Sequence, residues 1–373
     1  MKEKFFSYIS YYQWWKNLDK LILSLIVILF FIGLFFSLVS TSLIASDRLD
    51  TNSYFFFFKH IIFVLVGFVI IFFFSFIEPN NLYRLSIIVF FISLILLLLV
   101  PLIGVEVKGS KRWIDLFILP RIQPIELVKP FFIVSLSLII SSQKNFNLNF
   151  KYFISFLLTI FVSSLLIIQP DLGQTLLIAV TWIILIFISG INIFFLSSIF
   201  IFSITTLLLM VIYLPRFEYI KNRLLSFFDR ESGTHNFQSD KAIESITSGG
   251  FFGKGLGEGT LKNRVPEAHT DYIIAVISEE FGVIVIMLIL VIFLILIFSV
   301  LRKVYNENDE KIKLILTGSI SLILMQTMIH VGVNIRLFPT TGMTLPFLSY
   351  GGSSIIGVSI LSGIILNLTK RKL

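Results

Sequence analysis

Residues 265–282 read Val-Pro-Glu-Ala-His-Thr-Asp-Tyr-Ile-Ile-Ala-Val-Ile-Ser-Glu-Glu-Phe-Gly, a polar segment that runs directly into an apolar one. The polar part holds Glu267, His269 and Asp271, and the apolar part follows at once. Ionisable side chains are costly inside a bilayer, so this boundary places them at the edge of a membrane. The stretch therefore predicts a membrane-spanning helix with a chemically active cluster at its entrance.

The composition of the whole chain agrees with this interpretation. Of its 373 residues, 56% are hydrophobic, 42 are phenylalanine and only 14% are charged, with a mean hydropathy of +0.95. Soluble globular domains do not reach these values, so we expect an all-α, polytopic membrane protein. The net charge of +8 is typical of lysine and arginine in cytoplasmic loops, and we expect no nucleic-acid partner. Zero cysteines exclude disulfides, thiolate zinc sites and cysteine nucleophiles.

Apolar runs define the expected membrane helices, because a helix needs about 20 apolar residues to cross a bilayer. Ten runs fit, at roughly residues 21–43, 55–77, 82–103, 124–141, 152–168, 172–189, 192–214, 272–301, 314–334 and 346–368. An even number places both termini on the same side. We expect a single domain over residues 1–373, with one long loop, residues 215–270, between the seventh and eighth helices.

Lysine and arginine in the short loops indicate the orientation, since they accumulate on the cytoplasmic side. Their bias places both termini in the cytoplasm and residues 215–270 outside it. Four cations break the trend by gathering in one outer segment, residues 105–122: Lys108, Lys111, Arg112 and Arg121. This exception indicates an outward-facing site for an anion.

Asp271 stands at the start of the eighth run and is the candidate general base. Its alternative role is purely structural, as a carboxylate favoured by the dipole at a helix N-terminus. Both interpretations stay open from the residues alone. His269 is able to orient Asp271, to bind a substrate or to cap a turn, and Glu279 and Glu280 need a partner deeper in the run.

A second polar group opens the fourth run. Pro124 suits the first turn of a helix, and Glu126 and Lys129 are three residues apart, so they share a helix face. One interpretation is an ion pair that ties two helices together. The other makes Lys129 a diphosphate contact oriented by Glu126, with Arg112 near by.

Two outer segments are rich in glycine and small polar residues. In residues 249–259 the glycines predict turns, and residues 242–246 predict a short helix before them; the segment lacks the Gly-Lys-Ser/Thr ending of a nucleotide-binding loop. In residues 334–354, paired glycines permit close helix packing, while Arg336, Ser349 and Tyr350 add polar groups on the outer side. The four histidines have no spacing typical of metal ligands, so metal ligands stay unassigned.

Five motifs occur in order along nearly the whole chain. They are Gly109-Ser-Lys-Arg-Trp-Ile114, Gln123-Pro-x-Glu126-x-x-Lys129, Gln169-Pro-Asp-Leu-Gly173, Pro266-Glu-Ala-His-Thr-Asp271 and Pro346-Phe-Leu-Ser-Tyr-Gly-Gly-Ser-Ser354. Together they resemble the SEDS family (shape, elongation, division and sporulation). Gly255-x-Gly-Glu-Gly259, Lys262-x-Arg264 and the segment 341–346 resemble its division branch more than its elongation branch. Two positions depart from the family pattern: Ile125 replaces a small residue, and Tyr272 replaces phenylalanine.

The resemblance implies a peptidoglycan glycosyltransferase of the bacterial cytoplasmic membrane that polymerises lipid II at its outer face, at the division septum. Asp271 would be the catalytic base. The implied substrate-binding residues are Lys129, Glu126, Arg112, Trp113, Gln123, His269, Glu267, Arg336 and Ser349. The resemblance further implies no covalently bound cofactor, a divalent cation (magnesium or manganese) as a possible assistant, and binding of lipid II, nascent glycan, a class B penicillin-binding transpeptidase and divisome proteins.

Two other function classes compete with the enzyme. A lipid II transporter would use intramembrane charges and glycine-broken helices, but it needs polar groups through the full depth of the membrane. The charged candidates instead gather at the outer face. A non-catalytic scaffold for the transpeptidase would tolerate the loss of the Asp271 carboxylate. The elongation branch of the family would carry out the same chemistry.

Overall fold

The computed structural model describes residues 11–41, 54–107, 110–116, 119–142, 148–213, 217–228, 237–260 and 265–370. Gly109 and the Lys262-x-Arg264 motif lie outside the described residues, as does Lys108. The helices are α1 (Tyr11–Asn17), α2 (Lys20–Thr41), α4 (Phe55–Phe76), α5 (Pro79–Ile103), α6 (Pro124–Ile140), α7 (Leu148–Ile168), α8 (Leu172–Ile188), α9 (Ile193–Tyr213), α10 (Glu218–Phe228), α11 (Phe237–Gly249), α12 (Ile273–Tyr305), α13 (Glu310–Asn334) and α14 (Gly352–Leu368).

Each of the ten predicted apolar runs is helical over most of its length. Six helices are long and apolar enough to cross a membrane: α2, α4, α5, α7, α12 and α13. The helices α6, α8 and α14 have only 17 residues each, so the number of spans and their orientation stay predictions. The last helix begins at Gly352 and not at residue 346 as predicted. Pro346 and the left-handed backbone of Phe347 (φ 66°) keep the segment before it out of the helix.

The expectation of an all-α chain was incomplete, because a small antiparallel sheet connects α5 to α6. Its strands are β1 (Val105–Val107), β2 (Ser110–Leu116) and β3 (Leu119–Ile122), in the order β1-β2-β3. Val105 pairs with Trp113, but the next partner pair is Glu106 with Lys111, so the register shifts at Arg112. A bulge of this kind redirects a side chain.

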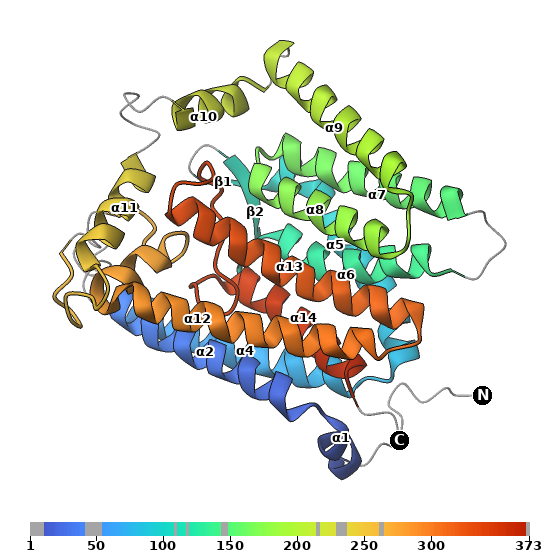
Figure 1. Ribbon diagram of the computed structural model, residues 1–373, viewed down its shortest axis with the longest axis horizontal. Helices are drawn as coiled ribbons and strands as arrows, with labels where there is room; N and C mark the ends of the chain where they lie inside the picture. Colours follow the sequence, from blue (N-terminus) through green and yellow to red (C-terminus); the bar gives the residue numbers. More distant parts are fainter. Residues whose placement is uncertain are drawn as a thin grey trace.

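The core of the bundle is built from α6, α13 and α14. Most residues of these three helices are buried, whereas α4, α5, α7 and α12 keep rows of exposed apolar side chains toward the outside. Helix α13 runs between α6, α8, α12 and α14, and α14 packs against α4 (Figure 1). The exposed apolar rows are those expected of surfaces that face lipid.

Helix α12 is interrupted. Gly282 has φ 80° and ψ 170°, which separates a short first piece, Ile273–Phe281, from a long second piece, Val283–Tyr305. At 1.5 Å per residue, the unbroken helix would be about 50 Å long and would exceed the bilayer core of about 30 Å. Only the second piece is therefore available as a full span, and the first piece serves to hold Asp271.

Asn367 ties the C-terminal end of α14 to that of α4 and provides a test of the packing. Its buried amide nitrogen lies 2.7 Å from the carbonyl oxygen of Phe74 and 2.6 Å from that of Ile77, at the end of α4. We expect Asn367→Ala to cost about 1–3 kcal/mol, because these carbonyls lose their donor. Thermal unfolding in detergent, followed by tryptophan fluorescence, should show a lowered melting temperature. The exposed Asn308→Ala is the control, and equal melting of the two variants would contradict the prediction.

Candidate functional site

The loop that carries Asp271 is folded tightly around one carbonyl group. The Glu267 carbonyl oxygen accepts hydrogen bonds from the backbone N–H groups of Thr270, Asp271 and Tyr272, at 3.1, 3.1 and 3.3 Å. Glu267 itself has a left-handed backbone (φ 56°). Asn334, the last residue of α13, donates its amide hydrogen to the carbonyl oxygen of Asp271 at 3.1 Å. These contacts fix the Asp271 backbone against the C-terminal end of α13.

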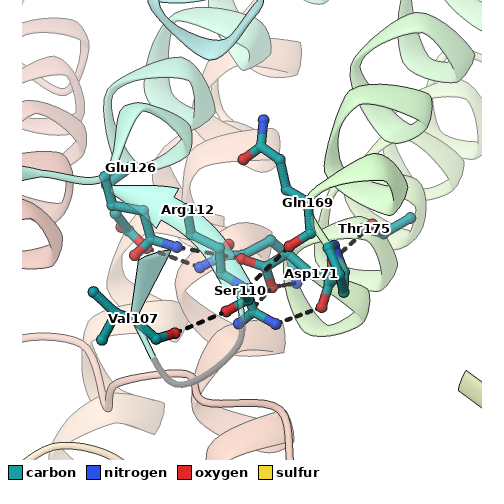
Figure 2. A network of polar contacts seen from close by, with 10 residues as sticks. Val107, Ser110, Arg112, Glu126, Gln169, Asp171 and Thr175 are labelled. Atoms are coloured by element: carbon teal, nitrogen blue, oxygen red, sulfur yellow. Dashed lines mark hydrogen bonds and ion pairs between the residues drawn. The ribbon is translucent and has the colours of Figure 1, made fainter. Parts of the chain in front are cut away.

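Arg112 approaches the same region from β2. Its guanidinium lies 3.8 Å from the carboxylate of Asp171 and donates hydrogen bonds to the carbonyl oxygens of Gln169, at 3.2 Å, and Pro170. Figure 2 shows the side chain reaching from the strand into this turn. Its side chain is 15% exposed, so one face of the cation remains accessible.

Gly342 lies next to both Asp271 and Arg112. A Cβ atom placed on Gly342 would lie 3.6 Å from Asp271 Oδ2 and 3.9 Å from Arg112 Nη1. Gly342 also has a left-handed backbone (φ 68°), which side chains other than glycine rarely adopt. A carboxylate and a cation thus both lie within contact distance of the place where a side chain of this residue would stand. We call this the Gly342 gap.

Asp171 supports Arg112 from the buried side. Besides the guanidinium, its carboxylate accepts the side-chain amide of Gln123 at 3.2 Å and the backbone N–H of Gln174 at 3.4 Å, as the cap of α8. Burial raises the pKa of the Asp171 carboxyl, while the positive charge of Arg112 acts in the opposite direction. The sequence had identified this residue only as part of a motif.

Glu126 and Lys129 form an ion pair inside the bundle. Lys129 Nζ lies 2.7 Å from Glu126 Oε2 and 3.1 Å from Gln326 Oε1, and Gln174 donates to Glu126 Oε1 at 2.8 Å. Glu126 is 3% exposed and Lys129 is 1% exposed. Gln326 in turn donates to the carbonyl oxygen of Thr344 at 2.9 Å. The pair therefore links α6, α8 and α13 to the segment that contains Gly342.

The other candidates are placed around this centre in different ways. The Ser349 hydroxyl donates to the Thr270 carbonyl at 2.6 Å and accepts from the Leu345 N–H at 2.9 Å, so it joins the two loops. The ring centroid of His269 lies 5.5 Å from that of Phe56 and 5.9 Å from that of Tyr350.

Two candidates lie apart from the Gly342 gap in their described contacts. Arg336 forms an ion pair with Asp240 of α11, and Trp113 pairs with Val105 in the sheet. Their roles in substrate binding, like those of the other candidates, stay predictions.

Three residues that support the site were not among the predicted site residues. Each could have been found from the sequence as a polar side chain within an apolar helix. Gln174, Gln326 and Asn334 are all buried amides, and each binds one of the candidate residues or its loop. Polar groups in membrane helices usually have such partners. Nothing in the sequence pointed to Gly342, because its role depends on Asp271 and Arg112, two side chains that only the fold brings next to it.

The described residues contain no group of three or more histidine, aspartate or glutamate side chains placed to hold a metal ion. A hydrated magnesium or manganese ion takes several oxygen ligands. Magnesium usually keeps several waters and is bound by one or two carboxylates together with substrate phosphates, so a requirement for such an ion stays a prediction.

The chain is similar to known proteins over almost its whole length. Residues 19–372 match the FtsW/RodA/SpoVE family model, described as "Cell cycle protein". The "Probable peptidoglycan glycosyltransferase FtsW" of Caulobacter vibrioides is 30% identical, over 96% of this chain and 91% of its own. "Stage V sporulation protein E" of Bacillus subtilis is 32% identical, over 94% of this chain and 97% of its own.

Solved structures show the same fold. A chain from the study "Structural coordination of polymerization and crosslinking by a peptidoglycan synthase complex" matches with a TM-score of 0.78 and 23% identity, over 95% of this chain and 98% of the other. The rod shape determining protein RodA of Thermus thermophilus matches with a TM-score of 0.69 and 23% identity, over 95% and 97% of the two chains.

Proposed function

Because the chain belongs to the FtsW/RodA/SpoVE family of cell cycle proteins, we propose that it is a peptidoglycan glycosyltransferase that polymerises lipid II. The family resemblance inferred from the motifs is thereby confirmed. We place the reaction at the outer face of the bacterial cytoplasmic membrane during division, because relatives named FtsW align over most of the chain.

The observation that carries the proposal is the Gly342 gap, because the Asp271 carboxylate and the Arg112 guanidinium lie 3.6 and 3.9 Å from a Cβ atom placed there. Glycosyl transfer to a hydroxyl needs a base for the proton and a cation for the departing diphosphate. General bases and preorganised charges contribute in this way to many enzymes. Asp271 is held by the loop before α12 and Arg112 by β2, so the two groups are positioned by separate parts of the chain.

In the proposed reaction, Asp271 accepts the proton of the GlcNAc 4-hydroxyl of the acceptor lipid II. The oxygen then bonds to the anomeric carbon of the donor strand, and the bond from that carbon to undecaprenyl diphosphate breaks with inversion. The diphosphate leaves with the bonding electron pair and is stabilised by Arg112. No step uses a protein-bound metal ion. A magnesium or manganese requirement is a separate proposal, tested by chelation with EDTA and readdition of each ion.

The primary test is polymerisation of labelled lipid II by the purified protein in liposomes, together with its class B penicillin-binding partner. We propose this partner because a structural neighbour comes from a peptidoglycan synthase complex. Glycan strands above the level of heat-treated protein are expected. Absence of glycan with movement of lipid II between leaflets would instead favour a transporter. We further propose that the protein binds divisome proteins and is located at the division septum.

Gly342→Ala provides a sharper test of the gap. The methyl group would stand next to Asp271 and Arg112, at ordinary contact distance from both, and would take space that the proposed substrates need. We expect a loss of polymerisation of about 10²-fold, as for other small misplacements at active sites. The matched control is Gly190→Ala. Gly190 also has a left-handed backbone (φ 90°), but a Cβ there meets nothing within 4 Å. Equal activity of both variants would mean that the gap does not hold the reacting groups.

A further inference from the structure

At the break in α12, backbone groups that lose their partners within the helix form hydrogen bonds with a loop from another part of the chain. The N–H groups of Val283 and Ile284, which follow the break, donate to the carbonyl oxygens of Gly250 and Phe251 at 3.0 and 3.4 Å. The carbonyl oxygens of Glu279 and Glu280, which precede it, accept from the N–H groups of Lys254 and Gly255 at 2.9 and 3.0 Å. Two donors and two acceptors freed at the break thus all find backbone partners in residues 250–255.

The loop is pressed directly against the break. A Cβ atom on Gly253 would lie 2.2 Å from the Glu280 carbonyl oxygen, and one on Gly282 would lie 2.1 Å from that of Phe251. Both glycines have φ 80°, so other residues are excluded by conformation as well as by space. The glycines form turns, as predicted from the sequence, and these turns fit one specific surface.

Complete pairing of backbone groups is what a membrane requires. In hydrocarbon each unpaired N–H or C=O costs several kcal/mol, whereas in water the solvent would satisfy it. The one cation of the loop is also paired, since Lys254 Nζ lies 3.5 Å from the buried carboxylate of Glu279. Glu279 further accepts from the Ser245 hydroxyl of α11 at 3.0 Å.

Three exposed side chains of the loop are large and apolar, and Lys254 is exposed beside them. Phe251 is 73% exposed, Phe252 is 84% exposed and Leu256 is 65% exposed. Phe251 is hydrogen-bonded to Ile284, the second residue of the long piece of α12, whose own exposed side chains continue with Met287 and Leu288. The apolar surface of the loop is therefore continuous with the start of a membrane span.

We propose that residues 250–257 insert into the outer leaflet and contact lipid acyl chains through Phe251, Phe252 and Leu256. The long outer loop is then partly embedded in the membrane, and α11, which directly precedes the inserted residues, packs against α12 (Figure 1). The inserted loop fixes the depth of the first piece of α12. Since that piece begins directly after Asp271, the loop sets the height of the proposed base relative to the lipid-linked substrate.

The chain has no cysteine, so single cysteines test the insertion without further engineering. Phe251→Cys, Phe252→Cys and Leu256→Cys are compared in liposomes with two controls. Lys221→Cys on exposed α10 reports a position in water, and Leu288→Cys on α12 reports a position in lipid. Each variant is first checked for monodisperse elution. Labelling by a membrane-impermeant maleimide is normalised to the total measured after detergent solubilisation.

We expect the three loop cysteines to react about tenfold more slowly than the Lys221 control, because thiols in hydrocarbon are shielded from water. A bimane attached to them after solubilisation and reconstitution should be quenched by nitroxide on lipid acyl chains, as at Leu288. Fast labelling without quenching would overturn the proposal. Fast labelling that disappears only when the penicillin-binding partner is added would also overturn it, and would assign the surface to a protein. Neither result depends on glycosyltransferase activity.

Discussion

Replacing Asp271 by asparagine is expected to lower the rate of lipid II polymerisation by about 10²- to 10⁴-fold, the usual contribution of a general base. Asparagine keeps the size of the side chain but cannot accept the proton of the attacking hydroxyl. The backbone contacts of the loop, to Glu267 and Asn334, do not involve the carboxylate. The variant should therefore fold normally and bind substrate while failing to turn it over.

The measurement compares wild type and Asp271→Asn in equal, monodisperse amounts, with the same transpeptidase partner. Asn334→Ala is a useful second variant, because it loosens the Asp271 backbone without removing the base. We expect it to lower activity less than Asp271→Asn does. Full activity of Asp271→Asn would exclude Asp271 as the base and would favour a scaffold whose partner performs the chemistry.

The sequence predicted the helices well because each membrane helix depends on local composition. Each of the ten apolar runs coincides with a helix, with boundaries that mostly agree within a few residues, while the number of helices that cross the membrane stays a prediction. The sheet between α5 and α6 was missed, since strands of three to seven residues that carry Lys111, Arg112 and Arg121 have little apolar pattern. The break at Gly282 was missed for a different reason. It depends on a loop about 30 residues earlier that supplies its hydrogen bonds.

The candidate site was predicted residue by residue but not as an arrangement. Sidedness placed Arg112 and Asp271 on the same outer face, yet only the fold brings both to Gly342. For Lys129 the sequence predicted the contact but not its surroundings. Its spacing from Glu126 predicted their pairing, which the structure shows, but spacing said nothing about whether the pair faces a substrate or the interior. Burial depends on α8 and α13, which are distant in the sequence.

Removal of Lys129 is the second change expected to have a large effect. In Lys129→Met the carboxylate of Glu126 stays buried without its cation, at a cost of about 3–5 kcal/mol. Gln174 still donates one hydrogen bond to it, which compensates only in part. We expect poor folding and loss of polymerisation, measured by thermal unfolding in detergent and by the lipid II assay.

The double variant Glu126→Gln/Lys129→Met separates the two roles that the sequence left open. It removes both charges at similar volume, and such replacements of buried ion pairs are often neutral for stability. Lys129 is fully enclosed by Glu126 and Gln326, so we expect the double variant to regain both folding and polymerisation. Recovered folding without polymerisation would contradict this expectation and would make Lys129 a diphosphate contact. In that case the interior of the bundle must open during the reaction, since the ammonium group is not accessible in this structure, and the anion would have to break the bond to Glu126 to reach it.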